Sequence, residues 1–298
     1  NIVTEFLLTK EAVDHGNPEL MKVWVNTKLG ETWEERGETA DDMALLSRRE
    51  MYPATVPAQV LVLTCGIDVQ DDRFELELVG WGVGKESWGI RYQKIYGDPL
   101  KPQIWEDLDR FLQTRWRRED GVVLDILAAA MDTGGHHTDA VYRFCLDRFY
   151  RHVYAIKGRG GTETPFVSKP STGNRVGVPL YTIGVDNGKT MVYQRLNVQA
   201  EGPNYCHFPL NEAAGYDEVY FKGLTAEKQV IRWKKGRPST SWELKDPNYH
   251  RNEPLDCRDY ALAALEIANP VLENPEEETE MQTPQRQAGR RIVSGGIG

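Results

Sequence analysis

Apolar residues fall into three closely spaced runs in the first third of the chain. Residues 61–68, 73–82 and 87–96 are largely apolar, and short polar turns such as Asp71-Asp72 separate them. Short apolar runs bounded by turn residues are typical of buried strands, and tight turns join antiparallel neighbours. The pattern therefore predicts an antiparallel meander of three strands.

The runs that follow alternate between helical and strand spacing. Residues 103–116 carry apolar side chains on one helical face and 139–150 are also helical, whereas 124–131, 152–157 and 180–185 are short apolar runs. Three hairpin-connected strands followed by helix, strand, helix and strand is the chain order of the RNase H-like fold. We therefore expect an α/β fold, in which parallel strands extend the antiparallel meander into a mixed sheet flanked by helices.

The two flanks differ in character from this central part. Residues 5–10, 18–29 and 39–50 have helical spacing, and Pro53 and Pro57 mark a boundary, so residues 1–58 are predicted to form a helical appendage. Residues 59–270 are predicted to form the main domain, with a last helix over 254–268. Residues 271–298 are rich in Pro, Glu, Gln, Arg and Gly, which predicts a disordered tail.

Composition excludes two classes of protein. No apolar run approaches 18 residues, so we expect no membrane-spanning helix and no membrane partner. The four cysteines are scattered singly and form no CxxC pair, which argues against a zinc ribbon or a disulfide framework and fits a reducing cytosol.

The net charge of −9 argues at first against a nucleic-acid ligand. However, residues 1–58 and 271–298 carry most of it, and residues 59–270 have a net charge of only −2. Two basic clusters in this part are candidates for contacts with a DNA backbone, although exposed loops are the alternative. They are Lys157 and Arg159 after a predicted strand, and Lys234, Lys235 and Arg237 at the tip of a predicted hairpin.

Three acids stand out by their position on the predicted elements. Asp68 ends the first strand, Asp132 ends the strand after the first core helix, and Asp256 lies in the first turn of the final helix. In an RNase H-like sheet the first and fourth strands are neighbours, so Asp68 and Asp132 are expected side by side. Taken singly, Asp256 could neutralise the helix dipole, Asp132 could shape a turn, and Asp68 could be a solvated strand end.

Close carboxylates point to a divalent cation. Two unit charges ~4 Å apart repel by roughly 4 kcal/mol at an effective dielectric near 20, so either one acid is protonated or a cation lies between them. Oxygen ligands favour Mg²⁺ or Mn²⁺ over zinc. Two such ions would activate water and stabilise the leaving oxygen of a phosphodiester.

With these residues assembled, the chain resembles the large terminase subunit of tailed bacteriophages, in its lambda-type branch. The resemblance covers about residues 20–270 and rests on four motifs. They are GIDVQDDR at 66–73, MDTGG at 131–135, NEPLDCRDYA at 252–261 and VNTKLGETW at 25–33, which is similar to the stretch after the ATPase domain in that branch.

The resemblance implies a Mg²⁺- or Mn²⁺-dependent endonuclease domain that cuts concatemeric viral DNA in the host cytoplasm, without the ATPase motor. It also implies double-stranded DNA as substrate, and the small terminase subunit and the portal protein as partners. The register of the last acid is ambiguous, so Glu253 and then Asp259 follow Asp256 as metal-ligand candidates. A non-catalytic DNA-clamping module and a resolvase-type nuclease are the rival interpretations.

Overall fold

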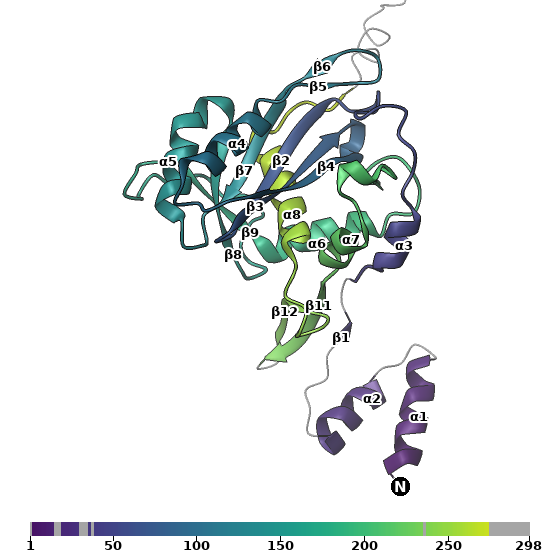
Figure 1. The fold of residues 1–298 in the computed structure, drawn as a ribbon. Helices are drawn as coiled ribbons and strands as arrows, with labels where there is room; N and C mark the ends of the chain where they lie inside the picture. Colours follow the sequence, from purple (N-terminus) through teal and green to yellow (C-terminus); the bar gives the residue numbers. More distant parts are fainter. Residues whose placement is uncertain (1, 15–18, 30–34, 37–38, 235–236, 274–298) are drawn as a thin grey trace, which may run out of the picture.

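A seven-stranded mixed sheet forms the centre of the molecule (Figure 1). The computed structural model describes residues 2–14, 19–29, 35–36, 39–234 and 237–273. The strands of this sheet are β2 (Val62–Val69), β3 (Arg73–Trp81), β4 (Ser87–Tyr96), β7 (Ile126–Asp132), β8 (Val153–Arg159), β9 (Leu180–Gly184) and β10 (Cys206–His207).

The order of the strands across the sheet is β10-β4-β3-β2-β7-β8-β9. β2, β3 and β4 form the predicted antiparallel meander, and β7, β8 and β9 then add in parallel on the other side of β2. This arrangement is that of the RNase H-like fold, so the predicted fold class is confirmed. The short strand β10 pairs in parallel with β4, which the sequence pattern did not predict.

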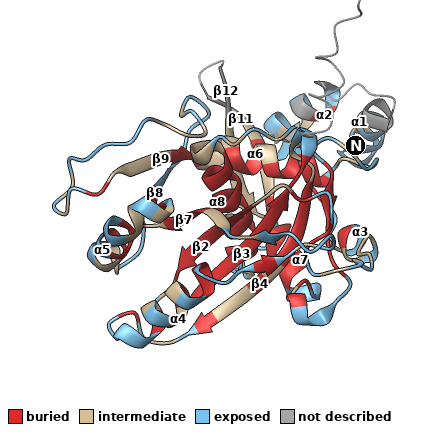
Figure 2. Ribbon diagram, turned by 90° about the horizontal axis from the view of Figure 1, so that it is seen from above, coloured by how far each residue is buried: buried red, intermediate tan, exposed pale blue. Residues whose placement is uncertain are grey.

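Helices cover both faces of the sheet (Figure 1). They are α3 (Asp42–Ser47), α4 (Pro102–Leu112), α5 (Thr138–Arg148), α6 (Val185–Leu196), α7 (Glu218–Leu224) and α8 (Glu253–Ala268). Apolar side chains of α4 and α5 pack on one face of the sheet, and those of α3, α6, α7 and α8 pack on the other. Buried residues concentrate in the central strands and α8 (Figure 2).

The close contact between α8 and β2 sets the distance between helix and sheet. A Cβ atom on Gly66 would lie 1.9 Å from the backbone oxygen of Cys257 and 2.5 Å from the nitrogen of Ala261. The Thr64 hydroxyl donates a 2.7 Å hydrogen bond to the Ala261 carbonyl, and Trp81 Nε1 donates one of the same length to the Thr64 hydroxyl. The backbone of α8 therefore rests directly on β2.

The N-terminal segment contains α1 (Ile2–Asp14), α2 (Glu19–Trp24), a π-helical turn (Val25–Leu29) and the short strand β1 (Glu35–Arg36). β1 pairs with β11 (Glu227–Lys234), which forms a hairpin with β12 (Arg237–Leu244). After α3, the Arg48 guanidinium donates hydrogen bonds to the carbonyls of Leu196, Val198 and Cys206, so this part of the predicted appendage packs on the central body.

Segments outside the sheet lie along both of its edges. The backbone nitrogens of Ser168 and Ser171 donate to the carbonyls of Thr182 and Leu180 in β9. At the opposite edge, the Glu50 N–H donates to the Phe208 carbonyl, and the Leu210 N–H donates to the Glu50 carbonyl. Phe208 and Leu210 follow β10 directly.

Several elements differ from the sequence-based expectation. The helix expected over 103–116 ends at Leu112, because Trp116 turns back to pack against Phe111 and joins β5 (Trp116–Arg117), paired with β6 (Val123–Leu124). α7 was not predicted. The predicted disordered tail lies mostly outside the described residues. None of the described helices has the length and apolarity needed to span a bilayer.

We expect Gly66→Ala to lower the free energy of unfolding by about 1–3 kcal/mol, because the new methyl group would collide with the backbone of α8. Urea unfolding followed by circular dichroism measures the change. Gly173→Ala is the matched control, since nothing lies within 4 Å of a Cβ atom there, and its midpoint should equal that of the wild type. Equal midpoints for all three proteins would contradict the proposed contact.

Candidate active site

Two of the predicted acids lie at the ends of neighbouring strands. β2 and β7 pair in parallel with Ile67 opposite Met131, so Asp68 and Asp132 are the next residues on each strand. Ile67 and Met131 belong to the core under α4 and α5. Because successive side chains of a strand point to opposite faces, Asp68 and Asp132 point to the face that α8 covers.

The charges of the three acids act on one another. The pKa of Asp68 is raised to about 8, mainly by burial and next by the negative charge of Asp256. The charge of Asp132 also raises it. Burial raises the pKa of Asp256 to about 6, against the opposing effect of Lys189. Burial also raises the pKa of Asp132. The structure therefore places Asp68 and Asp132 on neighbouring strands, with Asp256 near enough for its charge to interact with both.

The three acids of α8 have different surroundings. The Glu253 carboxylate forms an ion pair with Arg73, with 2.8 Å between Oε1 and Nη2. Asp259 is fully buried, neither of its oxygens has a hydrogen-bond partner among the described residues, and burial raises its pKa well above the usual range. A Cβ on Gly188 of α6 would lie 2.0 Å from its Oδ1, so Asp259 packs against α6. Of the α8 acids, Asp256 has the larger effect on the pKa of Asp68, ahead of Glu253.

Hydrogen bonds from the chain itself hold the strand acids. Asp68 Oδ2 accepts a short hydrogen bond from Gln70 Nε2, and Asp132 Oδ2 accepts the backbone N–H of Gly134 at 3.0 Å. In these orientations, no three His, Cys, Asp or Glu side chains of the described residues are grouped so that they could hold a metal ion.

A buried lysine pairs with the acid of α8. Lys189 Nζ lies 2.7 Å from Glu227 Oε1 and 3.4 Å from Asp256 Oδ1. Asn252 Nδ2 donates to the same Glu227 oxygen at 2.8 Å and to Asp256 Oδ2 at 3.2 Å. The amino-acid sequence gives no sign of this group, since its members come from α6, β11 and the start of α8, and nothing in their local patterns links them.

A second missed contact lies near the end of β7. His136 Nδ1 and His137 Nε2 lie 3.1 and 3.3 Å from Asp71 Oδ1, and the hydrogen bond from His136 lowers the pKa of Asp71. Asp71 follows β2 and the histidines follow β7, so this contact lies beyond the strand ends that carry Asp68 and Asp132.

The basic candidates divide into two groups. Lys157 follows Ile156, the strand partner of Asp132, and its charge opposes the rise in the pKa of Asp132. Lys157 and Arg159 are both exposed at the end of β8. At the hairpin tip, Lys235 lies outside the described residues, and of Lys234 and Arg237 only the backbone, within β11 and β12, is described.

Two terminases are similar to the chain over most of its length. It is 39% identical over 272 residues to the large terminase subunit of Escherichia phage lambda. The aligned region covers 90% of this chain and 41% of that protein. It is 32% identical over 295 residues to the large terminase subunit of Enterobacteria phage P21, covering 94% of this chain and 45% of that protein. The chain thus spans less than half the length of these relatives.

One solved structure is also similar to the chain, with lower sequence identity than the two terminases. It is a mutant nuclease domain of the large terminase subunit of bacterial virus Sf6, solved with manganese. The sequence identity is 14% and the TM-score 0.41, over 69% of this chain and 89% of that chain.

The family model described as "Terminase large subunit gpA, endonuclease domain" matches residues 1–276. This match and the two viral relatives confirm the resemblance found in the sequence motifs. The chain belongs to the endonuclease-domain family of the gpA-type large terminase subunits.

Proposed function

We propose that the protein is a metal-dependent DNA endonuclease whose metal ligands are Asp68, Asp132 and Asp256. The observation that carries the proposal is the convergence of these three acids, from two adjacent parallel strands and the first turn of α8, on one face of the sheet. Membership of an endonuclease-domain family supports it. Glu253 and Asp259 remain the second and third candidates for the last ligand.

The donor set fits Mg²⁺ or Mn²⁺. Carboxylate oxygens are the ligands that these hard cations prefer, and the mutual effect of the acids on their pKa values is what a positive charge between them would relieve. When bound, two such ions supply an activated water and neutralise charge on the phosphodiester.

The protein's own residues orient these acids and meet the DNA. Gln70 orients the Asp68 carboxylate, while Lys189 and Asn252 hold that of Asp256. Lys157 and Arg159 would bind DNA phosphates, and their exposure at the end of β8, after the strand partner of Asp132, supports this. Further contacts with the DNA backbone would come from the hairpin tip, through Lys234, Lys235 and Arg237.

The biological setting comes from the family. We propose that the substrate is concatemeric double-stranded viral DNA cut during genome packaging in the host cytoplasm, with the small terminase subunit and the portal as partners. We also propose that residues 59–270 form the nuclease domain, with residues 1–58 linking it to an ATPase domain and residues 271–298 as a tail.

Asp68→Asn is expected to reduce cleavage of plasmid DNA in Mn²⁺ by at least about a hundredfold, because an amide cannot replace a charged oxygen ligand. EDTA should stop cleavage by the wild type. Circular dichroism should show an unchanged fold, since Asn has the shape of Asp.

Asp125→Asn is the matched control, because Asp125 lies just before β7, at the end opposite Asp132, and its side chain is 71% exposed. Full activity of Asp68→Asn, or of the wild type in EDTA, would refute the metal-dependent mechanism. DNA binding without cleavage in any metal would favour a clamping module. A strong preference for branched over linear DNA would favour a resolvase-type nuclease.

Lys189→Met is expected to lower the free energy of unfolding by about 3 kcal/mol, because it leaves the buried Glu227 and the partly buried Asp256 without their cation. Adding Glu227→Gln should restore part of the loss, which a double-mutant cycle in urea would measure. Lys85→Met, which removes a partly exposed pair with Glu266, should cost about 1 kcal/mol or less. Additive effects of Lys189→Met and Glu227→Gln would show that these two residues are not coupled.

A further inference from the structure

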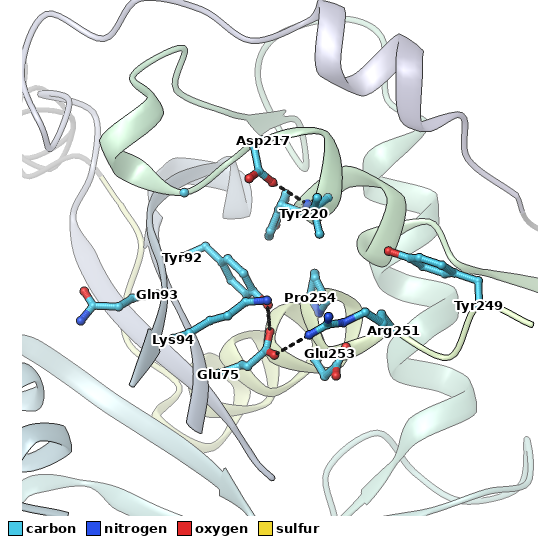
Figure 3. Close-up of a pocket in the computed structure, with 12 residues that line it drawn as sticks. Glu75, Tyr92, Gln93, Lys94, Asp217, Tyr220, Tyr249, Arg251, Glu253 and Pro254 are labelled. Atoms are coloured by element: carbon cyan, nitrogen blue, oxygen red, sulfur yellow. Dashed lines mark hydrogen bonds and ion pairs between the residues drawn. The ribbon is translucent and has the colours of Figure 1, made fainter. Parts of the chain in front are cut away.

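A second feature of the structure lies next to the acids. A cavity of about 250 Å³ opens between β3, β4 and the segments that lead into α7 and α8 (Figure 3). The fully buried Glu75 lines it from β3, and Tyr92 and Lys94 line it from β4. Tyr249 and Arg251 line it from the segment before α8, and Glu253 from the first residue of that helix.

The register of the sheet places this cavity beside the acid cluster. Glu75 is directly opposite Asp68 in the antiparallel pair of β2 and β3, so their side chains are neighbours on the same face. Glu253 precedes Asp256 by three residues, which is close to one turn of α8, and its charge raises the pKa of Asp68. The cavity that Glu75 and Glu253 line therefore lies beside the acids at which we propose the cut.

Aromatic rings form one part of the cavity wall. Tyr92 and Tyr220 pack edge to face with ring centroids 5.0 Å apart, and the Tyr92 hydroxyl donates a short hydrogen bond to Glu75. The partly buried Tyr249 extends toward the cavity from the segment before α8, and Lys222 Nζ lies 4.3 Å from the centroid of its ring. Because Lys222 lies over one face of this ring, the opposite face is the one on which an unpaired base can stack.

The charges in the cavity are arranged in two layers. Arg73 pairs with both inner acids, at 2.6 Å from Glu75 and 2.8 Å from Glu253, and also with the exposed Asp72 at 2.7 Å. Lys94 and Arg251 lie further from Glu75, at 3.4 and 3.8 Å, with side chains 24% and 50% exposed. An ammonium has three N–H donors and a guanidinium five, so both can bind a phosphate oxygen while staying near Glu75.

We propose that this cavity receives one unpaired nucleotide of the DNA strand beside the cut, with its base on Tyr249 and its phosphate on Lys94 and Arg251. The chemistry required is that of a nucleotide: a flat ring to stack, an anionic phosphate, and a base N–H group that faces carboxylate acceptors. The proposal deepens the proposed nuclease function and rests on it for the identity of the strand.

The test measures binding and not cleavage. A fluorescent duplex with one unpaired thymidine and a fully paired duplex of the same sequence are titrated with the full chain in Ca²⁺ and in EDTA. We expect the wild type to bind the bulged duplex about tenfold more tightly in Ca²⁺. Tyr249→Ala and the double variant Lys94→Ala/Arg251→Ala should each lose this preference, while Tyr249→Phe keeps it.

Tyr150→Ala is the matched control, since Tyr150 is 78% exposed and lies between α5 and β8, away from the cavity. Thymidine 5′-monophosphate as competitor separates a free nucleotide from one within a strand, and we expect it to compete only weakly. Equal wild-type affinity for the two duplexes, including no measurable affinity for either, would overturn the proposal, and so would tight monophosphate binding without a bulge preference. Because cleavage is not read out, a chain that cuts no DNA can still pass this test.

Discussion

The close approach of α8 to β2 at Gly66 is the contact on which the acid cluster depends. The strand presents no side chain at this point, so the backbone of the helix comes to within van der Waals distance of the sheet. The helix therefore enters the space above the ends of β2 and β7, where Asp68 and Asp132 lie. A larger residue at position 66 would move the whole helix outward, and Asp256 with it.

Distance alone does not orient a helix, and buried charges fix its rotation. Arg258 Nη1 lies 3.3 Å from Glu77 of β3, whose carboxylate also accepts hydrogen bonds from the Tyr216 and Tyr220 hydroxyls. Two residues earlier in the same helix, Asp256 faces Lys189. Turning α8 about its axis would separate both pairs and leave buried charges unpaired, which is strongly unfavourable. The helix that carries the third acid is thus held by its polar contacts as well as by its apolar face.

The sequence predicted the longer strands of the sheet, because each is an apolar run that ends at a turn. The order of these strands and helices matched the RNase H-like fold, in which the first and fourth strands are neighbours. Asp68 and Asp132 were therefore expected side by side, and the strand register places them so. The sequence left the choice among Glu253, Asp256 and Asp259 open, because what distinguishes them is contact with Arg73, Lys189 and Gly188 on distant elements. For the same reason it missed the cavity beside Glu75, whose walls come from four separate parts of the chain.

The segments that run along β9 and β10 have a consequence for association. An uncovered edge strand offers a row of free backbone groups to any other chain, and a mixed sheet such as this one has two edges. Here Ser168 and Ser171 occupy backbone groups of β9, and Glu50 occupies those of the residues that follow β10. At these positions the sheet is closed to a further strand, so a second copy of the chain cannot extend it there through backbone pairing.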